Sequence, residues 1–450
     1  MSLALRCSAI LPFVLAAPAL SQVAYNAPPP GQAVFFENLG VHHRRISSNQ
    51  PQAEAYFDQG LRFIYAFNLE EARRSFEQGT KFDPSAVMCY WGEALSLGPN
   101  INLPADPDRN AAAYRAARTA LALTSGRSGV ERDLAEAICK RYAEKLPADD
   151  AGKHALEQVY ADAMADLAKK YPGDADIQTL YAESLMDLRP WDLWTHDGKP
   201  QPGTEEIVAV LERVLAAHPD HPGANHYYIH AVEASPHPER ALAAAGRVAS
   251  LIPGAGHIVH MPSHIYMRVG RYEDAAEANR RAIRTDQTYL SLLDRRESPH
   301  PEFYAMYIAH NYQFLSAAAM MEGRSDEAVR AARDMVANVP EDMVGQMPEF
   351  DAVMAMPVEM EARFGQWDKV LAAKPMPEGM KFPEAMRRYA RGLAMTAQGK
   401  TDEAQKELDA VDAAIGATPA DAVSAVSSRI SRATASVRLS PNSTRPPGKV

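Results

Sequence analysis

The sequence predicts an all-α protein in which antiparallel helix pairs follow one another along the chain. Two observations carry this prediction. A spacing of small and aromatic residues in residues 53–84 recurs further along the sequence, and no segment shows the apolar–polar alternation of a half-buried strand. Apolar residues make up 46% of the chain and charged residues 23%, which is ordinary for a soluble globular protein.

The N-terminus predicts an exported protein. Arg6 gives a short positive start, residues 8–20 form an apolar run, and the small residues Ala19 and Ser21 lie at its end. This combination is typical of a secretory signal peptide, residues 1–21, because the run is too short to span a bilayer comfortably. A buried N-terminal helix is the alternative. We therefore expect a periplasmic or secreted protein without a transmembrane segment.

Both ends of the remaining chain are predicted to lie outside the helical array. Residues 22–49 form an N-terminal arm that contains His42 and His43, and we expect it to be solvated unless it folds back. Residues 413–450 are rich in serine with scattered basic residues, which predicts a flexible tail. A basic tail that binds a membrane surface is the weaker alternative, because the charges are sparse.

The clearest helix pair lies in residues 53–84. Small residues stand where two antiparallel helices would touch, aromatic residues fill the space between them, and a proline closes the unit. These positions are Gly60, Phe63, Ala72, Phe76, Gly79 and Pro84. The segment resembles the tetratricopeptide repeat (TPR) family. The resemblance implies a right-handed α-solenoid in which the first helix of each pair lines a concave groove, a surface that often binds protein or peptide partners.

Further helix pairs extend the array over residues 50–412, with about eight pairs in all. The next expected pairs are 87–100 with 111–123, 131–146 with 155–172, and 174–188 with 205–219. Two more units begin near Pro222 and Gly256, and the last pairs lie at 309–340, 349–373 and 385–411.

Charge and cysteine content narrow the function. The net charge of −10 argues weakly against nucleic acid as the main partner. Cys89 and Cys139 match no Cys-x-x-Cys motif, and we expect buried free thiols, although an oxidising compartment permits a disulfide. No nucleophile motif, phosphate loop or dinucleotide fingerprint stands in a credible context.

Histidines recur at the period of the repeat. His226 and His260 are 34 residues apart, as are His230 and His264. The resemblance places them at positions 5 and 9 of neighbouring first helices, where side chains point into the groove. Residues i and i+4 share a helix face, and packed helices lie ~8–10 Å apart. The four imidazoles are therefore expected to converge on one volume.

Three further residues are expected to complete this site. His257 and His310 take position 2 of their units, and Glu233 takes position 12. Imidazole is a good ligand for Zn, Cu, Fe or Ni, so the pattern predicts a transition-metal site, with Zn, Cu or Fe as the cofactor. If the chain is an enzyme, Glu233 is the expected general base of a metal-assisted hydrolysis. A redox metal with O₂ chemistry fits the histidines comparably well.

Other interpretations stay open. The histidines could bind a polar ligand without metal or pack structurally, and the chain could be a protein-binding scaffold without a cofactor. Ile229 stands where the repeat expects a small residue. A different turn between the helices would then rotate His226 and His230 relative to the groove.

Loop residues complete the expectations. Trp191 and Trp194 lie in an inserted loop and either form a lid or recognition surface or plug the gap that the insertion creates. We also expect Arg268 and Gln313 to line the groove. Three histidines in proline-rich turns are expected to be exposed, namely His218, His221 and His237.

Overall fold

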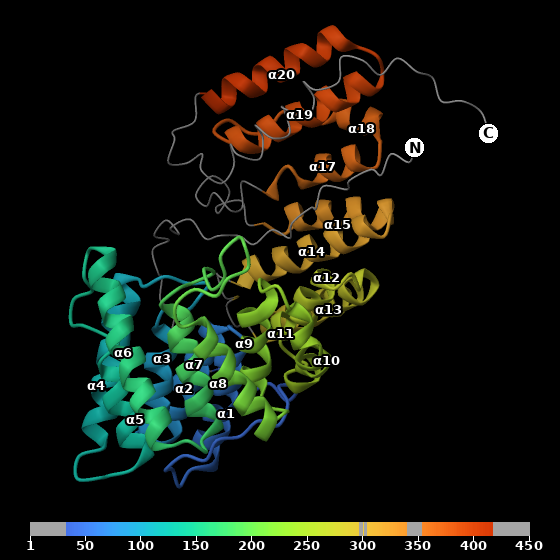
Figure 1. Cartoon of the computed structure of the whole chain (residues 1–450). Helices are drawn as coiled ribbons and strands as arrows, with labels where there is room; N and C mark the ends of the chain where they lie inside the picture. The colour runs from blue at the N-terminus through green and yellow to red at the C-terminus, as the bar shows by residue number, and fades with distance from the viewer. Residues whose placement is uncertain (1–32, 297–299, 301–303, 340–352, 417–450) are drawn as a thin grey trace. The chain divides into compact units, whose positions relative to one another are not determined.

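The computed structural model describes residues 33–296, 300, 304–339 and 353–416 (Figure 1). These residues form helices joined by loops, and their β pairing is limited to two isolated bridges. The predicted all-α class is therefore confirmed, and successive helices pack in pairs as in a TPR-like helical repeat. The predicted signal peptide and residues 417–450 of the predicted tail lie outside the described residues.

The chain divides into two compact units, and the first ends at Glu322. Its helices are α1 (Pro51–Tyr65), α2 (Leu69–Phe82), α3 (Val87–Leu97), α4 (Pro107–Leu123), α5 (Val130–Cys139), α6 (Asp150–Lys170), α7 (Ala175–Asp187), α8 (Thr204–Ala217), α9 (Pro222–Glu233), the 3₁₀ helix η1 (Pro238–Ala241), α10 (Leu242–Leu251), α11 (Gly256–His260), α12 (Pro262–Arg268), α13 (Tyr272–Arg295) and α14 (Tyr304–Met321).

The second unit begins at Gly323. Its described helices are α15 (Ser325–Ala337), α17 (Met356–Arg363), α18 (Trp367–Ala372), α19 (Lys381–Ala397) and α20 (Thr401–Gly416). Within this unit α15 packs against α17, and α19 packs against α20. A small apolar core joins α17, α18 and α19 through residues such as Val358, Val370 and Ala390.

The first helix pair forms as the sequence predicts. The side chain of Asn68 accepts a hydrogen bond from the backbone N–H of Glu71 and so caps α2. Gly60 on α1 permits the close approach of α2, since a Cβ at this position would lie 2.6 Å from the Phe76 ring. Phe63 and Phe76 are both buried, so the aromatic residues fill the space between the helices.

α5 ends earlier than predicted. We expected a helix over residues 131–146, but α5 ends at Cys139. The reason lies in Arg141, whose guanidinium is buried and donates to Glu157 at 2.8 Å and to Asp187 at 2.6 Å. Leaving a buried guanidinium unpaired is costly, so these ion pairs favour a turn over one more helical turn.

The first helix of the unit near Gly256 is also interrupted. Pro262 has no backbone N–H and cannot continue the hydrogen-bond ladder, so the segment divides into α11 and α12. The break falls between His260 and His264, which we expected on one continuous helix.

The described part of the N-terminal arm folds back onto the first unit. Phe36, Leu39 and Ile46 are buried. Gln59 on α1 accepts from the backbone N–H of Phe36 and donates to the carbonyl of Val34, both at 2.8 Å. The expectation of a solvated arm is therefore wrong for these residues, because apolar side chains in the arm bury surface against α1.

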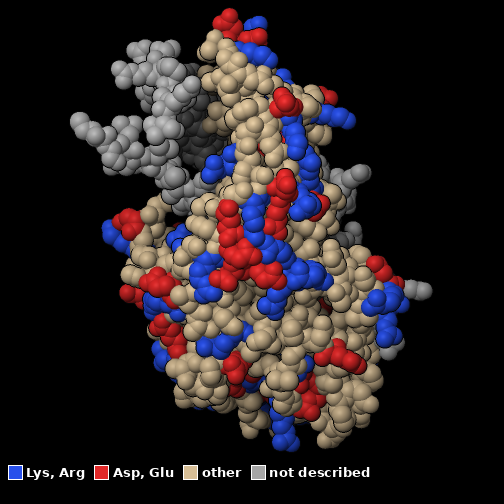
Figure 2. Space-filling view, turned by 90° about the vertical axis from the view of Figure 1, so that its right-hand side faces the viewer, with Lys and Arg blue, Asp and Glu red and all other residues tan. Residues whose placement is uncertain are grey.

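Charged side chains are interspersed on the face shown in Figure 2. On α13, for example, Arg280 pairs with Glu273 and Glu277, each at 3.0 Å. No helix within the described ranges is long and apolar enough to cross a bilayer. Cys89 and Cys139 are free thiols, as predicted; Cys89 is buried and Cys139 is half-buried.

Candidate metal centre

Six histidines lie together inside the first unit. They come from four helices, with His226 and His230 on α9, His257 and His260 on α11, His264 on α12 and His310 on α14. All but His310 are at most 6% exposed, and His310 is half-buried. We expected these rings in an open groove, but packing between the helices buries them.

The first group, called cluster A, is His226, His230 and His257. One ring nitrogen from each lies within 4.8 Å of the others, and the Nε2 atoms of His226 and His257 are 3.2 Å apart. Nδ1 of His226 donates to the carbonyl of Tyr65 at 2.7 Å, and Nδ1 of His230 donates to Glu233 at 2.8 Å. Because Nδ1 carries the proton in both neutral rings, each Nε2 atom carries a lone pair.

The second group, called cluster B, is His260, His264 and His310. The Nε2 atoms of His260 and His264 are only 2.8 Å apart. Nδ1 of His260 donates to Oδ1 of Asn279 at 2.6 Å; the amide orientation is set because Nδ2 of Asn279 donates to a backbone carbonyl. Nδ1 of His264 donates to Glu233 at 2.6 Å. When both rings are neutral, both facing Nε2 atoms therefore carry lone pairs.

Glu233 joins the two clusters. One carboxylate oxygen accepts from His230 of cluster A and the other from His264 of cluster B. Burial alone would raise the pKa of Glu233, but His264 and His230 outweigh this effect and hold it well below its usual range. The carboxylate thus fixes the Nδ1 proton of one ring in each cluster, that of His230 and that of His264.

Burial also favours the neutral form of five of the imidazoles. It lowers the pKa of His310 to about 3. It lowers the pKa of four other rings too, those of His226, His230, His257 and His260, and neighbouring histidines add to the effect. A neutral imidazole is the form that binds a metal.

The facing lone pairs are the decisive feature of this geometry. At 2.8 Å, Nε2 of His260 and Nε2 of His264 have no proton between them when both rings are neutral. Two lone pairs at this distance repel each other, whereas a cation held by both would remove the repulsion. Ligand nitrogens at ~2.0–2.1 Å from a tetrahedral ion lie roughly 3.3 Å apart, close to the 3.2 Å between His226 and His257.

One phenylalanine covers each cluster. The ring of Phe67 lies 4.5 to 5.9 Å from the three rings of cluster A. The ring of Phe314 lies 4.6 to 4.8 Å from those of cluster B. Such packing keeps water from the nitrogens and lowers the local dielectric.

Two aromatic residues at cluster A have unusual backbones. Among the described residues, the non-glycine positions with positive φ are Phe67 at 55° and Trp191 at 59°. Bulky residues rarely adopt this region, and such outliers concentrate at functional sites. Trp191 lies edge-on to His230 with ring centroids 5.3 Å apart. Both outliers therefore place an aromatic ring against the same cluster.

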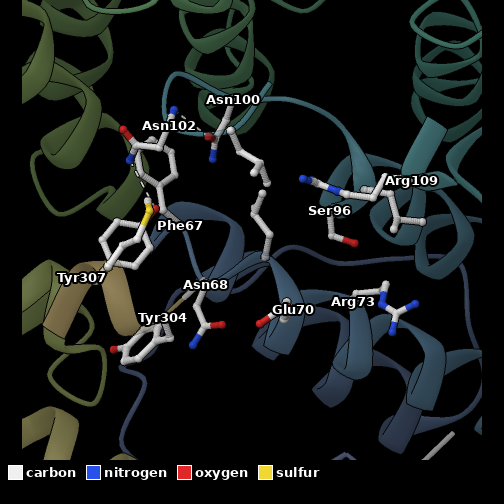
Figure 3. A pocket seen from close by; sticks show the side chains of 14 residues that line it. Phe67, Asn68, Glu70, Arg73, Ser96, Asn100, Asn102, Arg109, Tyr304 and Tyr307 are labelled. Carbon is white, nitrogen blue, oxygen red and sulfur yellow. Dashed lines mark hydrogen bonds between the residues drawn. The ribbon is translucent and has the colours of Figure 1, made fainter. Parts of the chain in front are cut away.

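Two pockets adjoin cluster A. One, of ≈ 400 Å³, is lined by Trp191, Trp194, His230 and Glu233. The other, of ≈ 580 Å³, lies beside Phe67, and Figure 3 shows Phe67 and Tyr307 at one end and Arg73 and Arg109 at the other. Tyr307 also packs on His257 with ring centroids 4.4 Å apart. The inserted tryptophans thus border a pocket at the candidate site.

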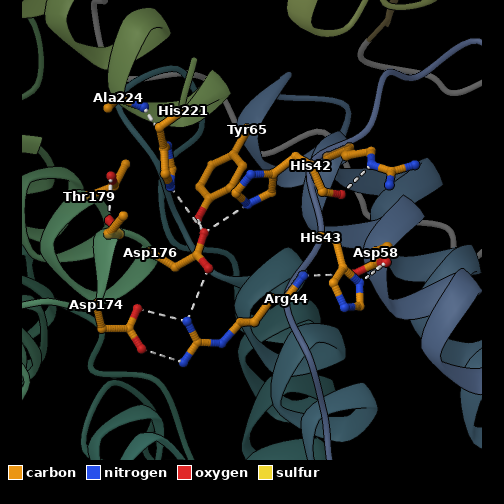
Figure 4. A network of polar contacts seen from close by, with 12 residues as sticks. His42, His43, Arg44, Asp58, Tyr65, Asp174, Asp176, Thr179, His221 and Ala224 are labelled. Atoms are coloured by element: carbon orange, nitrogen blue, oxygen red, sulfur yellow. Dashed lines mark hydrogen bonds and ion pairs between the residues drawn. The ribbon is translucent and has the colours of Figure 1, made fainter. Parts of the chain in front are cut away.

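A third group of histidines surrounds Asp176 (Figure 4). Oδ1 of Asp176 accepts from His42 at 2.9 Å, from His221 at 3.1 Å and from the Tyr65 hydroxyl at 2.6 Å, and Oδ2 accepts from Arg44 at 3.0 Å. Burial would raise the pKa of Asp176, but His221, His42 and the other partners hold it well below its usual range. We call these five residues the Asp176 network.

His221 shows why this network differs from the clusters. Its Nδ1 accepts from the backbone N–H of Ala224 and caps α9, so the ring proton lies on Nε2, which faces Asp176. The expectation that His221 is exposed is wrong, because this cap buries it to 4%. His218 and His237 are exposed, as predicted.

The structure brings the six expected ligands together but groups them differently. We expected one site around His226, His230, His260 and His264, whereas the rings form two clusters of three that are connected through the group of His230, Glu233 and His264. Gln313 is 6% exposed and its Oε1 lies 3.2 Å from Nδ1 of His310. Arg268 ends α12 and is half-buried, and its role in a groove stays a prediction.

Sequence reasoning missed four residues that shape the site. They are Tyr65, Phe67, Asn279 and Phe314. Asn279 could have been found from the sequence. It lies four positions after the buried Ala275 on α13, and a polar residue at such a position needs a buried partner. Phe67 and Tyr65 lie at the end of α1, far from the histidines in sequence.

Comparison with known proteins identifies no relative by sequence: no family model and no curated protein matches the chain. Solved structures show a distant likeness. The human IFIT1 dimer with PPP-AAAA has a TM-score of 0.42 at 11% identity, covering 81% of this chain and 73% of that one. The P58(IPK) TPR domain has a TM-score of 0.20 at 14% identity, covering 86% and 99%. The APC/C hetero-tetramer Cut9–Hcn1 has a TM-score of 0.26 at 13% identity, covering 86% and 78%.

Proposed function

We propose that this protein binds two transition-metal ions, one in cluster A and one in cluster B, through the Nε2 atoms of their histidines. The observation that carries the proposal is the pair of unprotonated nitrogens of His260 and His264 facing each other at 2.8 Å. Burial lowers the pKa of His260 and so disfavours a proton on that ring, whereas a cation bound by both nitrogens would satisfy both lone pairs.

The hydrogen bonds behind the rings support the proposal. Metal-binding histidines usually donate their other N–H to a carboxylate or carbonyl, which fixes the ring and makes the ligand nitrogen more basic. Five of the six rings have Nδ1 against an oxygen, and His257 is the exception. If these histidines only packed structurally through their Nδ1 hydrogen bonds, nothing would require their other ring nitrogens to point toward one another.

The donor set indicates the class of metal. Neutral imidazoles suit Zn, Cu, Fe or Ni, whereas Mg and Ca prefer oxygen ligands. Three protein ligands leave a coordination position open, as in catalytic zinc sites. The clusters therefore suit an ion that meets a small molecule, and storage or sensing of a metal is the alternative use.

Glu233 takes a different role from the general base that the sequence suggested. Both of its oxygens accept N–H groups from the clusters, so the geometry favours a residue that positions His230 and His264. The shared carboxylate also makes the two ions electrostatically dependent on each other.

We also propose that the chain is exported, as residues 1–21 suggest. In an exported protein, the clusters would take up their metal ions outside the cytoplasm.

Elemental analysis tests the proposed function. The full chain is expressed with export, purified, stripped of metal and titrated separately with Zn²⁺ and Cu²⁺. We expect about two equivalents of at least one metal, and His237→Ala, an exposed histidine outside the clusters, serves as the control that keeps both. A folded protein that takes up neither metal would support the scaffold without a cofactor instead.

A further inference from the structure

The pocket beside the inserted tryptophans opens directly onto cluster A. Its lining includes Met186, Trp191, Leu193, Trp194, His230 and Glu233. A mostly apolar lining with a few polar groups is typical of small-molecule sites. His230 and Glu233 supply the polar side of the pocket from α9.

A ligand nitrogen is available at this pocket. Nε2 of His230 is buried and finds no hydrogen-bond partner among the described residues, while its Nδ1 is held by Glu233. Buried polar atoms without partners are rare in proteins and call for an explanation. A metal ion on Nε2 of His230 would satisfy this atom and would lie next to the pocket.

The two indoles make the pocket a preformed aromatic site. Trp194 is fixed because its Nε1–H donates to the carbonyl of Ala231 at 2.7 Å. Trp191 is fixed in the left-handed backbone region with its ring edge-on to His230. Strain of this kind persists only where the surroundings enforce it, which favours a specific placement of the ring over simple gap filling.

We propose that this pocket binds a small neutral aromatic molecule with one oxygen donor, of the size and polarity of phenol. This inference rests on the proposed metal in cluster A. The ring would pack against the indoles and Met186, and the oxygen would face His230 and the ion it holds. Glu233 offsets part of the charge of the bound ion, and Arg189, the basic residue of the lining, is paired with Asp192 at 3.2 Å, so the lining offers an anion no unpaired cationic side chain.

Binding of phenol to the metal-loaded full chain tests the proposal, with benzoate and cyclohexanol as comparison ligands. Ala234 lines the pocket and is exposed, so Ala234→Trp fills the pocket from its edge without disturbing the core. Ala217→Trp, at an exposed position at the end of α8, is the matched control. Calorimetry measures affinity, and elemental analysis measures metal in every variant.

We expect Ala234→Trp to keep its metal and to bind phenol at least ~10-fold more weakly, as expected when a ligand loses its apolar contacts, while Ala217→Trp binds like the unchanged chain. Benzoate and cyclohexanol should also bind at least ~10-fold more weakly than phenol. Equal binding of phenol by both variants, or of benzoate and phenol by the unchanged chain, overturns the proposal. If the unchanged chain holds no metal but still binds phenol, and Ala234→Trp abolishes that binding, the metal site is refuted and the aromatic pocket is supported.

Discussion

Clusters A and B and the Asp176 network are built from the same residue types, yet their hydrogen atoms are arranged in opposite ways. In the network, His42, His221, Tyr65 and Arg44 all direct N–H or O–H groups at one carboxylate. In cluster B, the Nδ1–H groups of His260 and His264 point outward to oxygens, and their Nε2 lone pairs point inward at each other when both rings are neutral. Proximity of histidines and acids is therefore a weak criterion for a metal site.

The difference comes from the partner behind each ring. The backbone N–H of Ala224 occupies Nδ1 of His221 and forces its proton onto Nε2, toward Asp176. The side chain of Asn279 accepts from Nδ1 of His260 and leaves Nε2 bare, toward His264. The network is complete by itself, whereas cluster B presents ring nitrogens that a cation would bind. The two regions meet at Tyr65. Its hydroxyl donates to Asp176 in the network, and its backbone carbonyl accepts from His226 in cluster A.

The largest expected effect is loss of one ion when one cluster loses a ligand. His257→Ala should remove the ion of cluster A, and His310→Ala that of cluster B, because two imidazoles hold a metal far less tightly than three. The metal content should fall from about two equivalents to about one in each variant and to none in the double variant. Elemental analysis after dialysis measures this. Loss of both ions in either single variant would mean a single shared site.

Removing the centre of the Asp176 network should reduce stability rather than metal content. Asp176→Ala leaves the buried groups of His221 and Tyr65 without their acceptor, while Arg44 keeps Asp174, and the loss is expected to cost about 3–5 kcal/mol. Urea unfolding of the variant and the unchanged chain measures the loss. The folded variant should still bind about two ions. A stable variant that has lost metal would make this network the metal site.

Asp286 is a second buried carboxylate to compare with Asp176, because the groups that donate hydrogen bonds to Asp286 are neutral. It accepts from Tyr304 at 2.8 Å and from Asn311 at 2.7 Å, and burial raises its pKa to about 7 despite these hydrogen bonds. Between pH ~4 and ~7 the folded chain keeps a proton that the unfolded chain has lost, so this group lowers stability as pH rises, by at most ~1.4 kcal/mol per pH unit.

Asp286→Asn should remove this part of the pH dependence. Unfolding midpoints at pH 5 and pH 8 then differ less in the variant than in the unchanged chain, and the variant is the more stable of the two at pH 8. An unchanged pH dependence would show that the carboxyl is ionised throughout, as Asp176 is.

The smallest expected effect belongs to Glu233, which positions ligands without being one. Glu233→Gln replaces one accepting oxygen by an N–H₂ group that cannot face the N–H of a histidine. Both clusters should therefore bind metal about 10–100-fold more weakly while the protein stays folded. Glu239→Gln, an exposed neighbour, is the control. Weakening at only one cluster would show that Glu233 does not couple them.

The sequence predicted the helical class and the proximity of the six histidines, because both depend on local spacing. Gly60 and Phe76 mark a helix contact by their size, and the 34-residue period aligns His226 with His260. The grouping into two clusters was not predictable. It depends on how α9, α11, α12 and α14 pack against one another, which the sequence does not specify.

The roles of single histidines also escaped the sequence. His221 follows a proline-rich turn and looked exposed, but it caps α9 and reaches a carboxylate 45 residues away in sequence. His42 seemed to belong to a solvated arm, yet it packs between Tyr65 and His221. A histidine's protonated nitrogen is set by tertiary partners, so residue type and spacing alone do not separate a ligand from a structural side chain.

The central claim is that facing lone pairs, rather than proximity, mark the metal sites. Anomalous diffraction from crystals of the chain loaded with Zn²⁺ or Cu²⁺, recorded at the absorption edge of the metal, tests it most directly. The account predicts one peak within each of clusters A and B, at about 2.0–2.1 Å from the Nε2 atoms, and none at Asp176. A peak at Asp176, or two empty clusters in a metal-saturated crystal, would contradict it.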